Sequence, residues 1–311
     1  MIHTGQHYSY ELDKVFFEEL NLPQPKYNLE CGYETFRKQL GFMVKRASEV
    51  IKQENPDYMV VYADTASALG GALASLRNGK PLIHLEAGLR NNNPFSLEDT
   101  ITTTIDRLAE YHFAPTEKAK INLVEEGIEN DRIYVVGNPI VDAVYQNVEL
   151  SMKSDILKRL NLDGQSYFLF TAHRRENVDE FENLNKIINI LDVIIEKYKV
   201  PIICTLHPRT KKMLNNFGLK MPEKVTVLEP TGFLDFLKLE KNSSMILTDS
   251  CTLQEEACIL KVPCVTLDDK TARIETLQVG SNVIAGLELD KILNGIDLMY
   301  KKDRNWENPF G

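Results

Sequence analysis

The most specific chemical signal in the sequence is a histidine followed by two arginines, His173-Arg174-Arg175. It comes directly after the apolar run 167–171, which has the composition of a buried strand. Guanidinium groups bind phosphate through a planar fork, and an imidazole transfers protons near neutral pH. His207 follows the run 201–205 in a similar position. These residues predict phosphate binding beside proton transfer, against the alternative of a solvated basic turn.

Carboxylates follow two strand-like runs in the first half of the chain. Asp64 comes after the run 58–62, and Glu86 comes after the run 81–85, before a glycine turn and an arginine. Glu98 follows in a segment that the sequence predicts to be a polar loop. Carboxylates at strand ends suit general acid–base catalysis. The alternative for Asp64 and Glu98 is that each caps a helix.

A second anion site is predicted where the run 244–248 ends. The turn that opens the next helix carries small side chains: Ser250, Cys251 and Thr252. The first amides of a helix have no acceptor within it and attract anions, so a diphosphate fits there. Glu256, one turn further, is within reach of a ribose diol, and Arg273 is a second phosphate contact. Plain N-capping stays open, because spacing alone does not exclude it.

Short apolar runs alternate with amphipathic helical stretches along the whole chain. The predicted strands are 58–62, 81–85, 111–114, 132–136, 167–171, 201–205, 225–228, 244–248 and 264–267. The predicted helices are 33–53, 66–77, 117–126, 182–197, 232–239 and 253–260. Such a pattern predicts an α/β fold of two doubly wound domains, 1–145 and 146–311, with ligands at the carboxyl ends of parallel strands.

Composition and motifs exclude several classes of function. The net charge of −9 argues against a nucleic-acid-binding surface. No apolar run reaches the ~18 residues of a membrane span, and no signal peptide is visible, which predicts a cytoplasmic protein. The five cysteines include no CxxC pair and are predicted to be free thiols. Neither a GxGxxG fingerprint nor a P-loop is present, so dinucleotide redox chemistry and P-loop chemistry lack support.

Segments across nearly the whole chain resemble, in the family's order, the non-hydrolysing UDP-N-acetylglucosamine 2-epimerases. They are Thr4-Gly5-Gln6-His7, Asp64-Thr65, 84–90, 112–117, 136–139, 173–177, 248–250 and 254–257. The resemblance implies two Rossmann-like domains of the glycosyltransferase-B type with the active site between them. It also implies that UDP-N-acetylglucosamine and UDP-N-acetylmannosamine interconvert at C2. In the family, UDP is eliminated across C1–C2 to leave 2-acetamidoglucal and is then re-added, without a metal or a redox cofactor.

The resemblance assigns roles to individual residues. Asp64, Glu86 and Glu98 match the family's catalytic carboxylates, and His173 matches the histidine near the leaving diphosphate. The residues that match substrate contacts are Ser250, Cys251 and Thr252 at the diphosphate, Glu256 at the ribose, Arg273 at a phosphate, and Phe236 with Thr231 at the uracil. A second substrate molecule acts as an effector in bacterial members, and the matching positions here are Gln6, Arg174 and His207. A homodimer is also implied.

The sequence departs from the family pattern in four ways. The chain opens at what looks like the family's second strand, so the first strand with its GTRPE loop is expected to be missing and to leave a core edge exposed. The family's last helix is expected to be missing as well. The Asp-Ser-Gly-Gly turn reads Asp249-Ser250-Cys251-Thr252. The Pro-Glu-Glu-x-Asn-Arg segment reads differently at 97–102, and Ala63 replaces a glycine.

Three other functions remain open at this stage. A 2-epimerase of a modified UDP-diacetamido sugar or uronic acid would show the same nucleotide-binding residues. A hydrolysing epimerase that releases free N-acetylmannosamine fits the 86–90 segment less well. A non-catalytic UDP-sugar-binding relative would account for the altered turn at 250–252.

Overall fold

The computed structural model describes residues 1–6, 13–32, 35–91, 97–229 and 231–311. The chain forms two compact units, Met1–Pro139 with Phe310–Gly311, and Ile140–Pro309. The division falls shortly before the predicted domain boundary, and the last two residues return to the first unit. None of the helices in these residues is both long and apolar enough to cross a bilayer. The α/β class predicted from the sequence is confirmed.

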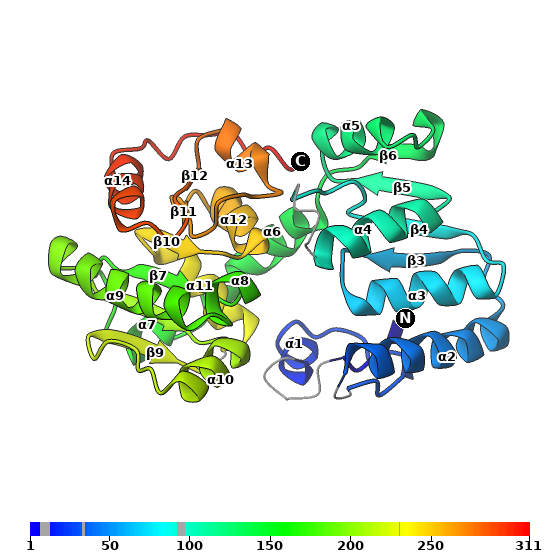
Figure 1. Cartoon of the computed structure of the whole chain (residues 1–311), viewed down its shortest axis with the longest axis horizontal. Helices are drawn as coiled ribbons and strands as arrows, with labels where there is room; N and C mark the ends of the chain where they lie inside the picture. The colour runs from blue at the N-terminus through cyan, green and yellow to red at the C-terminus, as the bar shows by residue number, and fades with distance from the viewer. Residues whose placement is uncertain (7–12, 33–34, 92–96, 230) are drawn as a thin grey trace. The chain divides into compact units, whose positions relative to one another are not determined.

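The second unit is built on a six-stranded parallel sheet in the order β12-β11-β10-β7-β8-β9 (Figure 1). Its strands are β7 (Phe168–Thr171), β8 (Ile202–Thr205), β9 (Val225–Leu228), β10 (Met245–Thr248), β11 (Cys264–Thr266) and β12 (Asn282–Ile284). The chain runs outward from β7 to β8 and β9, and then returns to β10 on the other side of β7. The point between β7 and β10 is therefore a topological switch point, where open parallel sheets bind ligands.

The helices of the second unit cover a sheet whose central strands are buried along their whole length. They are α6 (Pro139–Ser151), α7 (Ile156–Arg159), α8 (Arg175–Val178), α9 (Phe181–Tyr198), α10 (Pro208–Phe217), α11 (Phe233–Asn242), α12 (Cys251–Leu260), α13 (Ile274–Gln278) and α14 (Leu289–Tyr300). On α9 the residues Leu184, Ile187 and Leu191 recur at helical spacing and pack on Phe168 and Met245. Burial on both faces explains why these strands read as continuous apolar runs.

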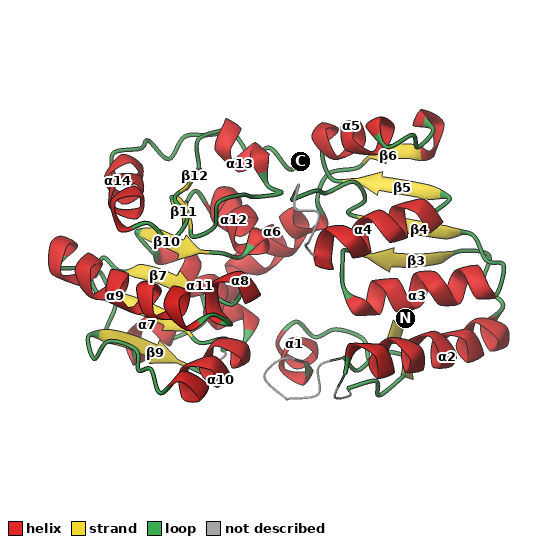
Figure 2. Ribbon diagram, viewed as in Figure 1, coloured by secondary structure: helices red, strands yellow, loops and turns green. Residues whose placement is uncertain are grey.

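The first unit contains two separate parallel sheets (Figure 2). β1 (Ile2–His3) pairs with β2 (Tyr27–Asn28), and a second sheet has the order β3 (Met59–Tyr62), β4 (Leu82–Leu85), β5 (Tyr111–Ala114), β6 (Ile133–Val135). The helices of the first unit are α1 (Lys14–Glu19), α2 (Phe36–Glu54), α3 (Ala66–Arg77), α4 (Leu97–Leu108) and α5 (Glu117–Glu125). Within the described residues β3 is an edge strand of this sheet.

The prediction of a loop around Glu98 is wrong, because this residue lies in the first turn of α4. Threonine-rich composition hid the helix, although Ile101 and Ile105 sit one turn apart and are both buried. Other elements were not predicted from the sequence either, among them the very short strands β2 and β12 and the helices α1, α10, α13 and α14.

Candidate active site

A buried carboxylate holds the His173 turn at the switch point of the second unit. Asp249 follows β10, is fully buried, and accepts hydrogen bonds from the backbone N–H groups of His173 and Arg174 at 3.0 Å each. It also accepts from the side-chain amide of Asn177 at 3.0 Å and lies 3.3 Å from Nδ1 of His173. A proton on Nδ1 facing this carboxylate leaves Nε2 as the reactive nitrogen. No role for Asp249 was predicted from the sequence, although this residue follows a strand beside the switch point.

The two strand-end histidines lie side by side. The ring centroids of His173 and His207 are 5.0 Å apart, with an angle of 32° between the planes. His207 caps α10, and its Nδ1 accepts from the backbone N–H of Arg209 at 3.1 Å. Imidazole groups therefore gather at the carboxyl ends of β7 and β8.

Arg174 connects the histidine turn to the start of α12. Its guanidinium donates to Asp268 at 3.0 Å and to Sγ of Cys251 at 2.9 Å. Burial raises the pKa of Asp268, and the positive charge of Arg174 acts in the opposite direction. Cys251 stands where the family has a glycine, so this departure brings a thiol against the arginine. The structure thus brings together Arg174 and the predicted diphosphate turn.

The N-terminus of α12 has the geometry expected for an anion site. Ser250 is the N-cap, and its Oγ accepts from the backbone N–H of Leu253 at 3.4 Å. Thr252 is exposed in the first turn. Ser250 thus acts as the cap that the sequence left as an alternative. The helix dipole adds partial positive charge at the same end.

Other predicted nucleotide contacts lie on α11, α12 and the segment before α13. Arg273 is buried and its Nε donates to Glu255 at 2.5 Å, which compensates the guanidinium charge. Thr231 has a buried Oγ1 without a hydrogen-bond partner in the part of the chain that is described. Phe236 is half-buried on α11. A buried hydroxyl without a partner loses free energy unless a ligand or water satisfies it, and this supports Thr231 as a binding group.

Glu256 faces a second buried carboxyl group, Glu240 of α11. Both side chains are almost fully buried. Burial, followed by the charge of Glu255, raises the pKa of Glu256 to about 8, and burial with the charge of Glu256 raises the pKa of Glu240 well above its ordinary value. Both carboxyls are therefore largely neutral at mildly acidic pH in the folded protein.

We expect stability to depend on pH through this pair. Because the pKa of Glu256 is higher in the folded protein than in the unfolded chain, its contribution to stability is fully present below about pH 4.5. The contribution is lost as the pH rises toward about 8, because between these values the carboxyl ionises freely only in the unfolded chain. Glu240→Gln removes one such group, so the loss of unfolding free energy between pH 5 and pH 8 should be smaller in this variant than in the wild type. Urea denaturation at both pH values measures it, and equal losses in the two proteins would contradict the expectation.

Asp64, in the loop after β3, is not the N-cap of the next helix, which was the alternative left open by the sequence. The cap of α3 is Thr65, whose side chain accepts from the backbone N–H of Ala68 at 3.1 Å. Asp64 lies one residue before the cap and is half-buried. Ala63, where the family has glycine, adopts a φ of 60°, which a side chain makes costly. The tight turn explains why a glycine suits this position.

Glu86 is held in a strained turn at the end of β4. Its φ is 63°, in the left-handed region, and the side chain is 8 % exposed. Non-glycine residues in this region cost on the order of 1–3 kcal/mol and cluster at functional sites. The hydroxyl of Tyr62 donates to Oε1 of Glu86 at 2.9 Å. Tyr62 was not predicted from the sequence as part of the site.

A buried network around Asp106 of α4 supports the turn after Glu86. Asp106 accepts from His84 Nδ1 at 2.6 Å, from Arg90 at 2.7 Å and from the backbone N–H of Gly88 at 3.3 Å. Burial opposes ionisation of Asp106, but the hydrogen bonds and charges of His84 and Arg90 hold its pKa below the ordinary value. Gly88 has a φ of 82°, and a Cβ there would lie 2.2 Å from the carbonyl oxygen of Ala119. Close packing and buried charge therefore fix this turn.

Two further predicted residues lie in the first unit. Glu98 is exposed on α4, directly after residues that the structure does not describe. Gln6 accepts a hydrogen bond from the hydroxyl of Ser67 at 2.8 Å, on the first turn of α3. His7 of the same motif lies outside the described residues.

These features define an α/β nucleotide-sugar-binding protein of the glycosyltransferase-B type, with charged groups at the strand ends of two parallel sheets. The family described as UDP-N-acetylglucosamine 2-epimerase matches residues 1–311. The chain belongs to this family, whose members are isomerases.

Individual relatives agree with this assignment. The UDP-N-acetylglucosamine 2-epimerase of Methanocaldococcus jannaschii is 47 % identical over 318 residues, covering 100 % of this chain and 87 % of the relative. A crystal structure of that organism's enzyme in complex with UDP-GlcNAc and UDP superposes with a TM-score of 0.95 at 48 % identity, covering 100 % of this chain and 87 % of that one. The Pseudomonas aeruginosa UDP-2,3-diacetamido-2,3-dideoxy-D-glucuronate 2-epimerase is 35 % identical, covering 94 % and 81 %. The family predicted from the sequence is confirmed.

Proposed function

We propose that the chain interconverts UDP-N-acetylglucosamine and UDP-N-acetylmannosamine at C2. The observation that carries the proposal is the switch point of the second unit, where Asp249 positions His173 and Arg174 beside the N-terminus of α12. The relative from M. jannaschii, whose crystal structure contains UDP-GlcNAc and UDP, supports this substrate.

The proposed reaction needs a base for the C2 proton and stabilisation of departing UDP. As the C2–H bond breaks, its electron pair forms the C1=C2 bond and the C1–O bond to UDP breaks, so the diphosphate carries away the negative charge. Arg174, Arg273 and the amide groups of α12 are proposed to stabilise that charge, and His173 is proposed to exchange a proton with it. Returning the proton to the opposite face and adding UDP back at C1 completes the inversion.

The carboxylates of the first unit are proposed to exchange protons with the sugar. Glu86 is the strongest candidate, because its buried, strained turn and its bond from Tyr62 fix its carboxylate. Asp64 and Glu98 remain predicted partners in this task. Ser250, Glu256, Thr231 and Phe236 are proposed to hold UDP.

Solvent exchange tests the reaction directly. The chain incubated with UDP-N-acetylglucosamine in D₂O should return nucleotide sugar that carries deuterium at C2, together with the second epimer. Nuclear magnetic resonance of the recovered sugar detects both products. UDP binding measured by calorimetry without any exchange would instead assign the chain to non-catalytic UDP-sugar binding.

A modified sugar is the second candidate substrate, favoured by the 35 % identical relative from P. aeruginosa. The same D₂O experiment with a UDP-2,3-diacetamido-2,3-dideoxy uronic acid compares the two. A higher kcat/KM for the uronic acid would transfer the assignment to that substrate. The effector site at Gln6, Arg174 and His207, the homodimer and the cytoplasmic location remain predictions.

Tyr62→Phe should change the pH dependence of turnover. The tyrosine hydroxyl donates to Glu86, and a donor to a carboxylate favours its ionised form. Removing it should raise the apparent pKa on the acidic side of the rate profile and lower kcat about threefold to tenfold at neutral pH. Steady-state rates across the pH range measure this, with Tyr58→Phe as the matched control. An unchanged profile would remove Tyr62 from the site.

A further inference from the structure

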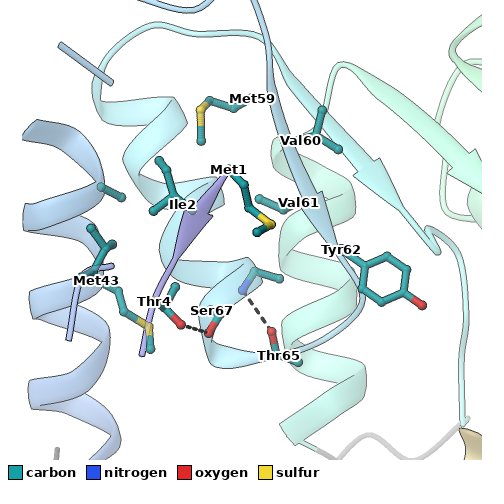
Figure 3. A pocket seen from close by; sticks show the side chains of 14 residues that line it. Met1, Ile2, Thr4, Met43, Met59, Val60, Val61, Tyr62, Thr65 and Ser67 are labelled. Carbon is teal, nitrogen blue, oxygen red and sulfur yellow. Dashed lines mark hydrogen bonds between the residues drawn. The ribbon is translucent and has the colours of Figure 1, made fainter. Parts of the chain in front are cut away.

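Glu240 of α11 is a buried carboxyl group to which the proposed reaction gives no task. It is 1 % exposed, and its Oε2 has no hydrogen-bond partner in the part of the chain that the structure describes. By contrast, the polar side chains that line a pocket of about 430 Å³ beside β3 are hydrogen-bonded, as Thr4 is to Ser67 at 2.7 Å (Figure 3). A buried polar atom without a partner costs free energy, so Glu240 is expected to serve a purpose other than stability.

Glu240 is held as a neutral acid beside Glu256 of α12. Burial, then the charge of Glu256 and the hydrogen bond to that residue, raise the pKa of Glu240 well above its ordinary value. Burial, followed by the charge of Glu255, raises the pKa of Glu256 to about 8, and the hydrogen bond from Glu240 acts in the opposite direction. A hydrogen bond that favours the acid form of Glu240 and the ionised form of Glu256 has Glu240 as its donor.

The other ionisable groups near this pair of carboxyls have partners of their own. Glu255 accepts from Nε of Arg273 at 2.5 Å. The hydroxyl of Tyr167 donates to a backbone carbonyl of α11 at 2.6 Å, and burial, with the charge of Glu240, raises its pKa, so this hydroxyl is neutral. Nζ of Lys238 donates to a backbone carbonyl just after α6 at 3.3 Å. Among these described groups none is a cation that pairs with either carboxyl, so the hydrogen bond between the two carboxyls is their main polar contact.

Glu256 lies one helical turn beyond the predicted diphosphate turn. It is four residues after Thr252 on α12, so the two residues lie on one face of the helix, about 6 Å apart along its axis. Side chains on a helix lean toward its N-terminus, so the carboxyl of Glu256 is expected to lean toward the anion site. In a nucleoside diphosphate the ribose adjoins the diphosphate, and its two hydroxyls are donors that suit a carboxylate.

We propose that Glu240 is a positioning residue for recognition of the ribose. Its carboxylic acid O–H donates to Glu256 and fixes that carboxylate, whose remaining lone pairs accept from the two ribose hydroxyls. The inference rests on the proposed UDP site, in which Glu256 contacts the ribose. A carboxylate has about four acceptor positions, so one bond from Glu240 leaves enough of them for the diol. The arrangement selects ribonucleotides, because a 2′-deoxy ligand leaves an acceptor of the buried Glu256 unsatisfied.

A comparison of UDP with 2′-deoxy-UDP tests the proposal on the 311-residue chain. The ratio of the two Kd values, measured by calorimetry at pH 8, cancels what the ligands share, including the ionisation of the diphosphate. The wild type should bind UDP at least about tenfold more tightly than 2′-deoxy-UDP. Glu240→Met removes the donor but keeps an unbranched side chain, and it should reduce this ratio to about threefold or less.

A second substitution at the same position separates the donor from the packing of the side chain. Glu240→Gln keeps an N–H that can donate to Glu256, so it should preserve the ratio of the wild type. The matched control is Glu223→Met, at an exposed glutamate of the same unit, and it should also leave the ratio unchanged. Equal losses of discrimination in Glu240→Met and Glu240→Gln would overturn the proposal, because the donor would then not matter.

The pH dependence of the wild-type ratio is a measurement that needs no substitution. The ribose hydroxyls donate to the ionised form of Glu256, whose pKa is raised to about 8, so the ratio should increase at least about threefold between pH 6 and pH 8.5. A flat ratio, or a folded Glu240→Met protein that discriminates like the wild type, would overturn the inference while UDP binding itself remains. A wild-type chain that does not bind UDP would overturn the proposed function and this inference together.

Discussion

Glu86→Gln is expected to lower kcat at least about 100-fold while UDP still binds with its normal affinity. Glutamine has the shape of glutamate but cannot take up the C2 proton. The residues proposed to hold UDP belong to the second unit, so the loss should appear in kcat and not in nucleotide affinity. Deuterium incorporation at C2 in D₂O measures turnover, and calorimetry with UDP measures binding.

The matched control for this variant is Glu110→Gln, an exposed glutamate of the same unit just before β5. It should leave turnover within about twofold of the wild type, because surface substitutions have small effects. A Glu86→Gln protein that is folded and turns over like Glu110→Gln would exclude Glu86 from the chemistry. The catalytic role would then move to Asp64 or Glu98.

Asp106→Asn should reduce the free energy of unfolding by about 3–5 kcal/mol. The substitution removes the buried negative charge that compensates Arg90 and accepts from His84, so polar groups lose a partner in an environment that water does not reach. Arg90 keeps its pair with Glu126, with two bonds of 2.7 Å, which limits the loss. Urea denaturation monitored by circular dichroism measures the change.

Asp106 also positions the turn that carries Glu86, through its bond to the N–H of Gly88. The folded fraction of Asp106→Asn is therefore expected to show a lower kcat with little change in UDP affinity. Asp131→Asn, an exposed aspartate of the same unit, is the control for both measurements. A stability loss below 1 kcal/mol would show that His84 and Arg90 do not depend on this carboxylate.

Much of the fold was predictable because buried strands consist of apolar residues, which are visible in the sequence. The strands of the second unit are buried on both faces, so β7, β8 and β10 are continuous apolar runs and were placed within one or two residues. α4 was missed, because its four threonines obscure a helix that two buried isoleucines anchor. Short edge elements such as β2 carry too few residues for any period to emerge.

The sequence predicted the candidate residues that follow a strand. It did not predict the residues that hold another residue of the site in place. His173, Glu86 and Ser250 follow strand ends directly, and the rule on strand carboxyl ends finds them. Asp249 accepts a hydrogen bond from the backbone N–H of His173, 76 residues away in sequence. Asp106 accepts one from the backbone N–H of Gly88, 18 residues away. Such pairings depend on sheet order, which no local pattern contains. The left-handed turn at Ala63 runs against the preference of its own residue type.

The second unit has its own hydrophobic core, built around β7 and α9, and every residue proposed to hold UDP belongs to it. UDP bound there should therefore stabilise the second unit, and we expect the two units to unfold separately. A differential scanning calorimetry trace should resolve into two heat-absorption peaks, of which added UDP moves one upward and leaves the other in place. The peak that added UDP shifts would therefore identify the part of the chain that carries the UDP-binding site.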